Sequence, residues 1–466
     1  MVRDLERTSK EGIGTGYTRG VNSKSAIVAL GVALVACGVL FWLSGRGGGG
    51  GGKPGETELP AWTRGFDPAR VTGLRVQWPD GGVAQLEPTP VTDVWLLECD
   101  GERWPVATTR IRGALRLIGE MSVGSEAEGE ELVGGVVVRL TTPAGEGVVR
   151  VGSDVVGGKG WARLEGEGGA PRVAVVDGGF TRLFTKQGLL AWREPVPMLP
   201  LPGETMRLKV VAGGLGSEVT RVKGRWGMTV PVGAPADGEF VQAAIARAHG
   251  MKVTRVLTVA EASGLGFDEP TAVVVSETRV GGEGMSVVQE AVIGNAADVS
   301  GESAYVRGRG VWVEGDGKER AAWGPVVFVV ERSSIERLTA DPRAYVSKRA
   351  VESPAADVLR VVVRVGGGER EYRRELNGWS VKEGAVGEVG ALVGLLCEKD
   401  AGMPALAEPT GWRAIAEVEL SGSGGALAKV VVGEGKGAKG ERVLVVKTAE
   451  VWREYAWEAG VGAWLE

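Results

Sequence analysis

The chain has 466 residues, of which 43% are hydrophobic and 24% charged, and this composition is typical of a globular protein large enough for several domains. The net charge of −5 and the pI near 5.5 provide no basic surface, so nucleic-acid binding is not expected. The 77 glycines follow no three-residue period, which excludes collagen and predicts many short strands joined by turns.

The first predicted element is an apolar helix at residues 25–43, SAIVALGVALVACGVLFWL, which contains no charged residue. A helix of this length can cross a hydrocarbon core of about 30 Å, so we expect a single membrane-spanning anchor. Residues 1–24 hold more Lys and Arg than the stretch after the span, which predicts a cytoplasmic N-terminal tail. The sequence therefore predicts an inner-membrane protein with an extracytoplasmic, periplasmic bulk.

The same segment has a second interpretation as a lipoprotein signal. Leu34-Val35-Ala36-Cys37 resembles a bacterial lipobox, in which the cysteine is lipidated and becomes the new N-terminus. The residues after Cys37 stay apolar, whereas the tether behind a lipidated cysteine is usually polar, so the uncleaved anchor is favoured. Residues 44–67 follow as a linker, because the six glycines Gly47–Gly52 are typical of a flexible tether.

One pattern of strand, turn, tryptophan and helix then occurs three times. The copies begin with VTGLRVQW, TMRLKVVAGG and ADVLRVVVRVGGG, and we align them on Leu74, Leu208 and Leu359. Each continues to a tryptophan and then to apolar residues at helical spacing. We predict an α+β fold with three antiparallel-sheet-plus-helix units, at residues 68–200, 201–355 and 356–466, the third one truncated. The equivalent tryptophans, expected to fill the space between sheet and helix, are Trp95, Trp226 and Trp379.

This arrangement resembles a bacterial family called domain of unknown function 4340. The resemblance covers roughly residues 68–466, where the repeated units lie, and the N-terminal span is a further shared feature. It also includes a strand-end Val-Gly and a Gly-Leu-x-x-Pro-like lead-in to the next strand. The lead-in is clearest at Gly264–Pro270 and weaker at Ala405–Pro409, and the first unit has EELVGG in its place. The resemblance implies no known activity and an accessory role beside an ABC transporter permease and ATPase of the gliding type.

No catalytic, cofactor-binding or metal-binding residue is predicted. His249 is the only histidine, and with Gly250 behind it we interpret it as the end of a helix. The GKGAKG segment at Gly435–Gly440 satisfies G-x-G-x-x-G but joins two predicted strands, so a hairpin turn is expected rather than a dinucleotide site. The GSDVVGGKG segment at Gly152–Gly160 is interpreted in the same way.

Cysteines and acidic residues give no stronger site. Cys99 and Cys397 are expected as two buried thiols, with a bridge between them as the alternative. The acidic run Ser125–Leu132 lacks the order of a calcium loop and is expected to be solvated. Trp457 and Trp464 near the chain end are expected to dock on their own unit.

These patterns favour a non-catalytic accessory or scaffold protein that acts through protein–protein interaction in an envelope or transporter complex. One alternative is an envelope enzyme that uses carboxylate chemistry, with Asp268 and Glu269 as generic candidates. Another is a receptor for a small apolar or sugar-like ligand, in which tryptophans line a pocket.

Overall fold

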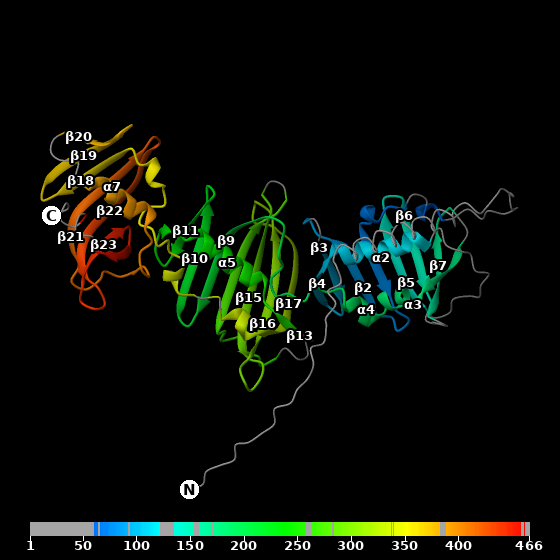
Figure 1. Cartoon of the computed structure of the whole chain (residues 1–466). Coiled ribbons are helices and arrows are strands. Elements are labelled where there is room, and N and C mark those ends of the chain that lie inside the picture. Colours follow the sequence, from blue (N-terminus) through cyan, green and yellow to red (C-terminus); the bar gives the residue numbers. More distant parts are fainter. Residues whose placement is uncertain are drawn as a thin grey trace, which may run out of the picture. The chain divides into compact units, whose positions relative to one another are not determined.

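The computed structural model describes residues 60–63, 66–91, 94–121, 135–152, 158–168, 171–257, 263–281, 284–336, 338, 340–382, 388–457 and 461. The predicted N-terminal tail, apolar span, lipobox, glycine run and acidic run, as well as Trp464, lie outside the described residues. Three antiparallel sheets account for most of the described chain, one within each predicted unit (Figure 1). We call these parts of the chain units 1, 2 and 3.

Unit 1 has an eight-stranded sheet in the order β4-β3-β2-β1-β5-β6-β7-β8. The strands are β1 (Gly73–Gln77), β2 (Val83–Pro88), β3 (Val94–Cys99), β4 (Glu102–Ala107), β5 (Val136–Thr142), β6 (Gly145–Val151), β7 (Lys159–Gly166) and β8 (Arg172–Asp177). The helices are η1 (Ala61–Thr63), η2 (Pro68–Arg70), α2 (Thr108–Met121), α3 (Gly178–Leu183) and α4 (Lys186–Leu190).

Unit 2 has a nine-stranded sheet in the order β12-β11-β10-β9-β14-β15-β16-β17-β13. The strands are β9 (Glu204–Ala212), β10 (Leu215–Val222), β11 (Arg225–Val230), β12 (Ala234–Pro235), β13 (Val253–Leu257), β14 (Ala272–Arg279), β15 (Ser286–Ala296), β16 (Ser303–Val313) and β17 (Glu319–Glu331). The helices are α5 (Gly238–His249), α6 (Arg332–Ile335) and η4 (Pro342–Ala344).

Unit 3 has a seven-stranded sheet in the order β20-β19-β18-β21-β22-β23-β24. The strands are β18 (Arg360–Val365), β19 (Gly368–Glu375), β20 (Gly378–Val381), β21 (Arg413–Gly422), β22 (Gly425–Lys436), β23 (Arg442–Thr448) and β24 (Val451–Ala456). The helices are η5 (Ala355–Asp357) and α7 (Val389–Glu398). β24 takes the place that β8 and β17 have in their sheets, so unit 3 does contain the strand that the sequence alignment left out.

The structure corrects two predictions. The α+β class is wrong, because the described chain is mostly β, with a single helix of ten or more residues beside each wholly antiparallel sheet. The predicted single-pass anchor and inner-membrane localisation are also overturned. No helix among the described residues is long and apolar enough to cross a membrane, and the longest of them, α2, has 14 residues where about 20 are needed.

Sheet register shows that the three tryptophans are equivalent. In each sheet, two successive cross-strand pairs connect a residue of the first strand to a residue of the third strand. These connected residues are Leu74 and Leu97 in unit 1, Leu208 and Met228 in unit 2, and Val361 and Val381 in unit 3. Each tryptophan precedes the third-strand residue by two positions and so shares its face. The predicted alignment on Leu359 is wrong by two residues, since Leu359 is 43% exposed and Val361 is fully buried.

Two of the three tryptophans, Trp226 and Trp379, lie where the sheet meets its helix. Trp95 and Trp226 are 7% and 8% exposed, whereas Trp379 is half-buried against the core of unit 3. A Cβ atom added at Gly238, the first residue of α5, would lie 3.6 Å from the Trp226 ring. Gly390 in α7 stands at the same distance from Trp379. The predicted position between sheet and helix is therefore confirmed for these two, with less burial at Trp379.

Trp62 adds an anchor to unit 1 from the stretch predicted to be linker. Its indole N–H donates to the Glu165 carbonyl at 2.8 Å, and its ring lies over Gly147 and Gly166, which face each other across β6 and β7. A Cβ at either glycine would collide with the indole. The chain is thus already part of the unit 1 core before η2.

The outer face of each sheet, opposite the helix, carries cross-strand ion pairs between arginine and glutamate. Such pairs keep a sheet face solvated, although each exposed pair contributes little to stability. In unit 3, hydrogen bonds from Arg360 and Arg373 lower the pKa of Glu371 to about 2. The pairs include Arg139–Glu146 and Arg150–Glu165 in unit 1, Arg207–Glu218 and Arg309–Glu290 in unit 2, and Arg360–Glu371, Arg364–Glu419 and Arg413–Glu434 in unit 3.

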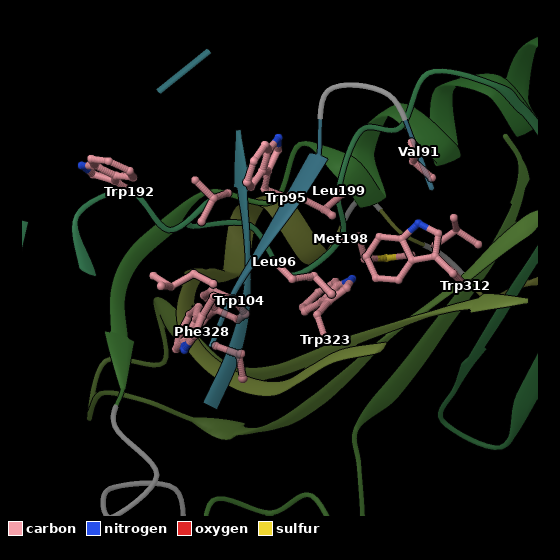
Figure 2. Packing of buried hydrophobic residues seen from close by; sticks show 14 of the residues in the cluster. Val91, Trp95, Leu96, Trp104, Trp192, Met198, Leu199, Trp312, Trp323 and Phe328 are labelled. Atoms are coloured by element: carbon pink, nitrogen blue, oxygen red, sulfur yellow. The ribbon is translucent and has the colours of Figure 1, made fainter. Parts of the chain in front are cut away.

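Successive units are joined through buried contacts. Trp104 of β4 meets Phe328 of β17 edge-on, with ring centroids 6.1 Å apart (Figure 2). Gln289 of β15 accepts a hydrogen bond from Leu199 N at 2.6 Å and donates to Leu199 O at 2.9 Å. Ser347 connects units 2 and 3, because its N–H donates to Pro235 O within unit 2 at 3.0 Å and its carbonyl accepts from Arg453 Nε of unit 3 at 2.9 Å.

Candidate functional site: an uncovered sheet edge in unit 1

The single histidine has the structural position that the sequence predicts. His249 is the last residue of α5, and Gly250 N donates to Ala246 O at 2.9 Å. Burial lowers the pKa of the imidazole, and within the described residues its Nε2 atom has no hydrogen-bond partner. No group of three or more His, Cys, Asp or Glu side chains in the described chain could hold a metal ion.

The glycine-rich loops and the acidic pair lie in connections between strands. Gly435–Gly440 links β22 to β23, so the predicted hairpin is confirmed, and Gly152–Gly160 links β6 to β7. Asp268 and Glu269 are exposed side chains on the loop before β14. The described residues of these segments lie in three different units, Gly435–Gly440 in unit 3, Gly152 and Gly158–Gly160 in unit 1, and Asp268 and Glu269 in unit 2.

The remaining sequence candidates are buried or belong to their own unit. Cys99 of β3 and Cys397 of α7 are free, buried thiols, so the prediction of two buried thiols is confirmed and the bridge between them is not formed. Trp457 lies under the Arg442 guanidinium, 3.6 Å from the ring centroid, and contacts the unit 3 core. Trp457 thus docks on its own unit as predicted.

Two large cavities are lined mainly by polar and charged side chains. One of 780 Å³ lies on the outer face of β1, β2, β5 and β6. The other, of 740 Å³, lies between α5 and residues 347–352. Trp226 lines the second cavity, but it is only 8% exposed and has Asp237, Glu239 and Lys348 around it. Neither cavity is the tryptophan-lined pocket that the receptor alternative expects.

In unit 2, the lead-in Gly264–Pro270 folds onto the outer face of its own sheet. Leu265 and Phe267 pack with Tyr305, Val327 and Val329 in a small second core. Leu265 O accepts a hydrogen bond from Asn295 N at 2.9 Å, and a Cβ atom at Gly294 would collide with Leu265 O. The strand-end glycine noted in the sequence is therefore required by the covering segment.

Unit 3 has the same device with different residues. Ala405 and Trp412 cover Val443, Val445 and Trp452, and the Trp412 and Trp452 rings meet edge-on with centroids 6.4 Å apart. A Cβ atom at Gly433 would collide with the Trp412 ring and with Arg413 O. The second strand-end glycine thus has the same role as the first.

In both units the chain ahead of or within the covering segment also closes the outer edge of the sheet. In unit 2, β13 pairs antiparallel with β17. In unit 3, Ala405 exchanges two hydrogen bonds with Trp452, of 2.8 and 2.9 Å, and Gly402 N donates to Glu454 O at 3.3 Å. An open edge would expose unpaired backbone groups, and these two units provide their own partners for them.

The register identifies the corresponding place in unit 1. In each sheet, three residues on neighbouring strands lie side by side across the strands and form a row. The row begins at the glycine near the end of the inner strand and continues to the two strands beyond it. The covering segment packs on Tyr305 and Val329 of this row in unit 2 and on Val445 in unit 3, where Glu454 is exposed. The rows are Gly152–Trp161–Val175 in unit 1, Gly294–Tyr305–Val329 in unit 2 and Gly433–Val445–Glu454 in unit 3.

In unit 1 two residues of this row are exposed, whereas Gly152 is buried. Trp161 and Val175, which are direct cross-strand partners, have 36% and 37% of their surface accessible. Among the described residues, no strand pairs with the outer edge of β8. Trp161 O accepts a hydrogen bond from Gly152 N at 2.8 Å, so the backbone of Trp161 points toward β6 and that of its partner Val175 points to the open edge. We call Trp161, Val175 and the outer edge of β8 the unit 1 patch.

The charged groups beside the patch are held in fixed pairs. Arg150 and Arg163 both reach Glu165, each at 3.0 Å, so two cations share one carboxylate. Sequence reasoning missed this patch, although the absence of a Gly-Leu-x-x-Pro-like lead-in in the first unit was the signal that could have identified it. No family model, curated protein or solved structure matches this chain.

Proposed function

We propose that this chain is a non-catalytic interaction protein that binds another polypeptide through the unit 1 patch. The observation that carries the proposal is the exposure of Trp161 and Val175, because their equivalents Tyr305 and Val329 in unit 2, and Val445 in unit 3, pack against segments of their own chain. An open strand edge can be extended by a strand of a partner, and Trp161 and Val175 beside it would add side-chain contacts.

Elsewhere the outer sheet faces carry cross-strand ion pairs. Arginine–glutamate pairs such as Arg139–Glu146 and Arg309–Glu290 keep those faces hydrated and unsuited to apolar contacts. The accessory role beside ABC transporter components, which the family resemblance implies, is a proposal about the partner's identity. It is tested by the same experiment.

A photo-crosslinking residue at position 175 of the full chain, expressed in its native host, tests the proposal. The matched control places the same residue at position 329, because Val329 has the equivalent row position but is covered and 8% exposed. We expect a crosslink to a second polypeptide from position 175 only. Trp161→Glu should abolish it, whereas Val222→Glu, a change at a 64% exposed valine elsewhere, should leave it unchanged.

The crosslinked partner must be mapped by mass spectrometry and must be lost with Trp161→Glu while Cys99 remains protected from thiol reagents. Crosslinks that form only within the chain, or that survive Trp161→Glu, would contradict the proposed function. An ABC transporter permease or ATPase as the mapped partner would support the implied accessory role.

A further inference from the structure

We infer that the cavity on the outer face of unit 1 binds a small hydrophilic carboxylate, of the class of sugar acids, through the guanidinium groups of Arg75 and Arg139. This site goes beyond the proposed function, because it lies on β1, β2, β5 and β6 and shares no residue with the unit 1 patch. Its volume of 780 Å³ is within the range of about 300–1,000 Å³ that small-molecule sites have.

The cavity lies at a place where units 2 and 3 carry an ion pair from the first strand of the sheet to the second. The pairs are Arg207–Glu218 and Arg360–Glu371, each with 2.9 Å between Nε and Oε1. The register places Gly73 at the position of the two arginines and Gln85 at the position of the two glutamates. Unit 1 therefore has neither the long side chain nor the carboxylate at this place, and both Gly73 and Gln85 line the cavity.

Two arginine residues face each other across the strands in this cavity. Arg75 of β1 and Arg139 of β5 are direct cross-strand partners on the outer face, an arrangement of like charges that destabilises a sheet. Glu146 pairs with Arg139 at 3.1 Å, whereas Arg75 has no ion-pair partner among the described residues. The equivalent cross-strand pairs in the other two units combine no like charges and are Lys209–Val275 and Val362–Glu419.

This arrangement of charges favours an anionic ligand. An anion between the two guanidinium groups would remove their repulsion and would give Arg75 a partner. A guanidinium binds a planar carboxylate through two parallel hydrogen bonds, as arginine does with glutamate side chains. The ligand's carboxylate would thus supply the negative charge that Glu218 and Glu371 supply in units 2 and 3.

The acidic residues of the cavity limit the charge of the ligand. Glu87 and Glu146 both line it, and Glu87 accepts a hydrogen bond from the Gln85 amide. Two glutamates therefore stand beside the two arginines, and the cavity as a whole is close to neutral. A ligand with one negative charge is repelled less by these glutamates than a phosphate ester, whose charge is about −1.5 to −2 at neutral pH.

The rest of the lining favours hydroxyl groups on the ligand. Gln77, Gln85 and Thr141 present groups that can both donate and accept hydrogen bonds. No aromatic residue is among the described residues that line the cavity, so an apolar acid would gain little contact there. A carboxylate whose other substituents are hydroxyl groups fits both features.

The test titrates the full chain with D-glucuronate and follows binding by ligand-observed NMR, with D-glucose and glucose 6-phosphate as the neutral and phosphate-bearing controls. We expect saturable binding of glucuronate and at least about tenfold weaker binding of both controls. Arg75→Gln should weaken glucuronate binding by about tenfold or more, because its charge-assisted hydrogen bonds are lost. Arg207→Gln, the matched change at an ion-paired arginine of unit 2, should leave binding unchanged.

A second variant tests the cavity without removing a charged residue. Gly73→Arg combined with Gln85→Glu introduces the ion pair that units 2 and 3 have, and it should abolish binding. In every variant, Cys99 must remain protected from thiol reagents, which shows that unit 1 is folded. Trp161→Glu should leave glucuronate binding unchanged, because the unit 1 patch is a separate surface.

Three results would overturn the inference. The first is the absence of saturable glucuronate binding to the unmodified chain. The second is binding that persists in Arg75→Gln or in the double variant at Gly73 and Gln85, because neither the free guanidinium nor the cavity would then be the site. The third is tighter binding of glucose 6-phosphate than of glucuronate, which would assign the cavity to phosphate esters.

Discussion

Removal of the Trp379 side chain tests the packing of unit 3 locally. A fully buried tryptophan replaced by alanine costs about 3–5 kcal/mol, and Trp379 is only half-buried, so we expect about 2 kcal/mol for Trp379→Ala. The indole lies against Gly390 of α7, and the same helix carries the buried Cys397, 2% exposed. Burial raises the pKa of the Cys397 thiol to about 11, so it reacts slowly until α7 opens.

Pulsed labelling with a thiol reagent in a Cys37→Ser background therefore measures the opening of α7. A loss of about 2 kcal/mol should accelerate the labelling of Cys397 about 30-fold, while Cys99 in unit 1 should keep its rate and serves as the internal control. Trp226→Ala, at an 8% exposed site, should cost more, about 3–5 kcal/mol in denaturant unfolding. A Cys397 rate unchanged within about threefold would refute the role of Trp379 as the filler between sheet and helix.

Three further predictions concern Gly433, the partly buried His249 and the buried Arg453. Gly433→Ala should destabilise unit 3 by about 1–3 kcal/mol, because the new Cβ collides with the Trp412 ring, whereas Gly402→Ala has open space around it and should be silent in denaturant unfolding. Burial lowers the pKa of His249 below its ordinary 6.5, so near this pH the unfolded chain binds a proton that the folded chain does not bind. The free energy of unfolding should therefore fall as the pH drops below about 6.5, and His249→Gln should reduce this pH dependence. Arg453 is fully buried, and within the described residues its Nη atoms have no partner, so Arg453→Met should be tolerated within about 1 kcal/mol while Arg453→Ala costs several; equal losses in thermal unfolding would contradict this.

The repeated pattern predicts the placement of the strands and tryptophans well, because a two-residue period and a helical period leave clear traces in the sequence. Even the misalignment on Leu359 is a shift of two residues, which preserves the face that each side chain occupies. The fold class is mispredicted for a related reason. Each helix gives one long, easily recognised pattern, whereas seven to nine short strands dominate the structure of each unit.

Such local patterns cannot predict which side chains pack over residues that are distant in the sequence. Trp62 is a single aromatic beside a glycine-rich stretch, and nothing in its neighbourhood indicates that it covers Gly147 and Gly166. The unit 1 patch depends on comparing three sheets in register, since Trp161 alone looks like any strand tryptophan. The strand-end glycines are visible in the sequence, but only the covering segments explain them.

The central strand pairs have a consequence for how the chain acquires its structure during synthesis. Leu74 pairs with Leu140, Leu208 with Ser276 and Val361 with Leu420, partners roughly 60–70 residues apart along the chain. The first hairpins of each unit can form as soon as they leave the ribosome, but the sheet closes only after the helix and the next strand have emerged. Such non-local closure is slow compared with hairpin formation. Each unit therefore passes through a stage in which a half-sheet with an open central edge awaits its second half, and the succession of units along the chain sets the order in which those edges are closed.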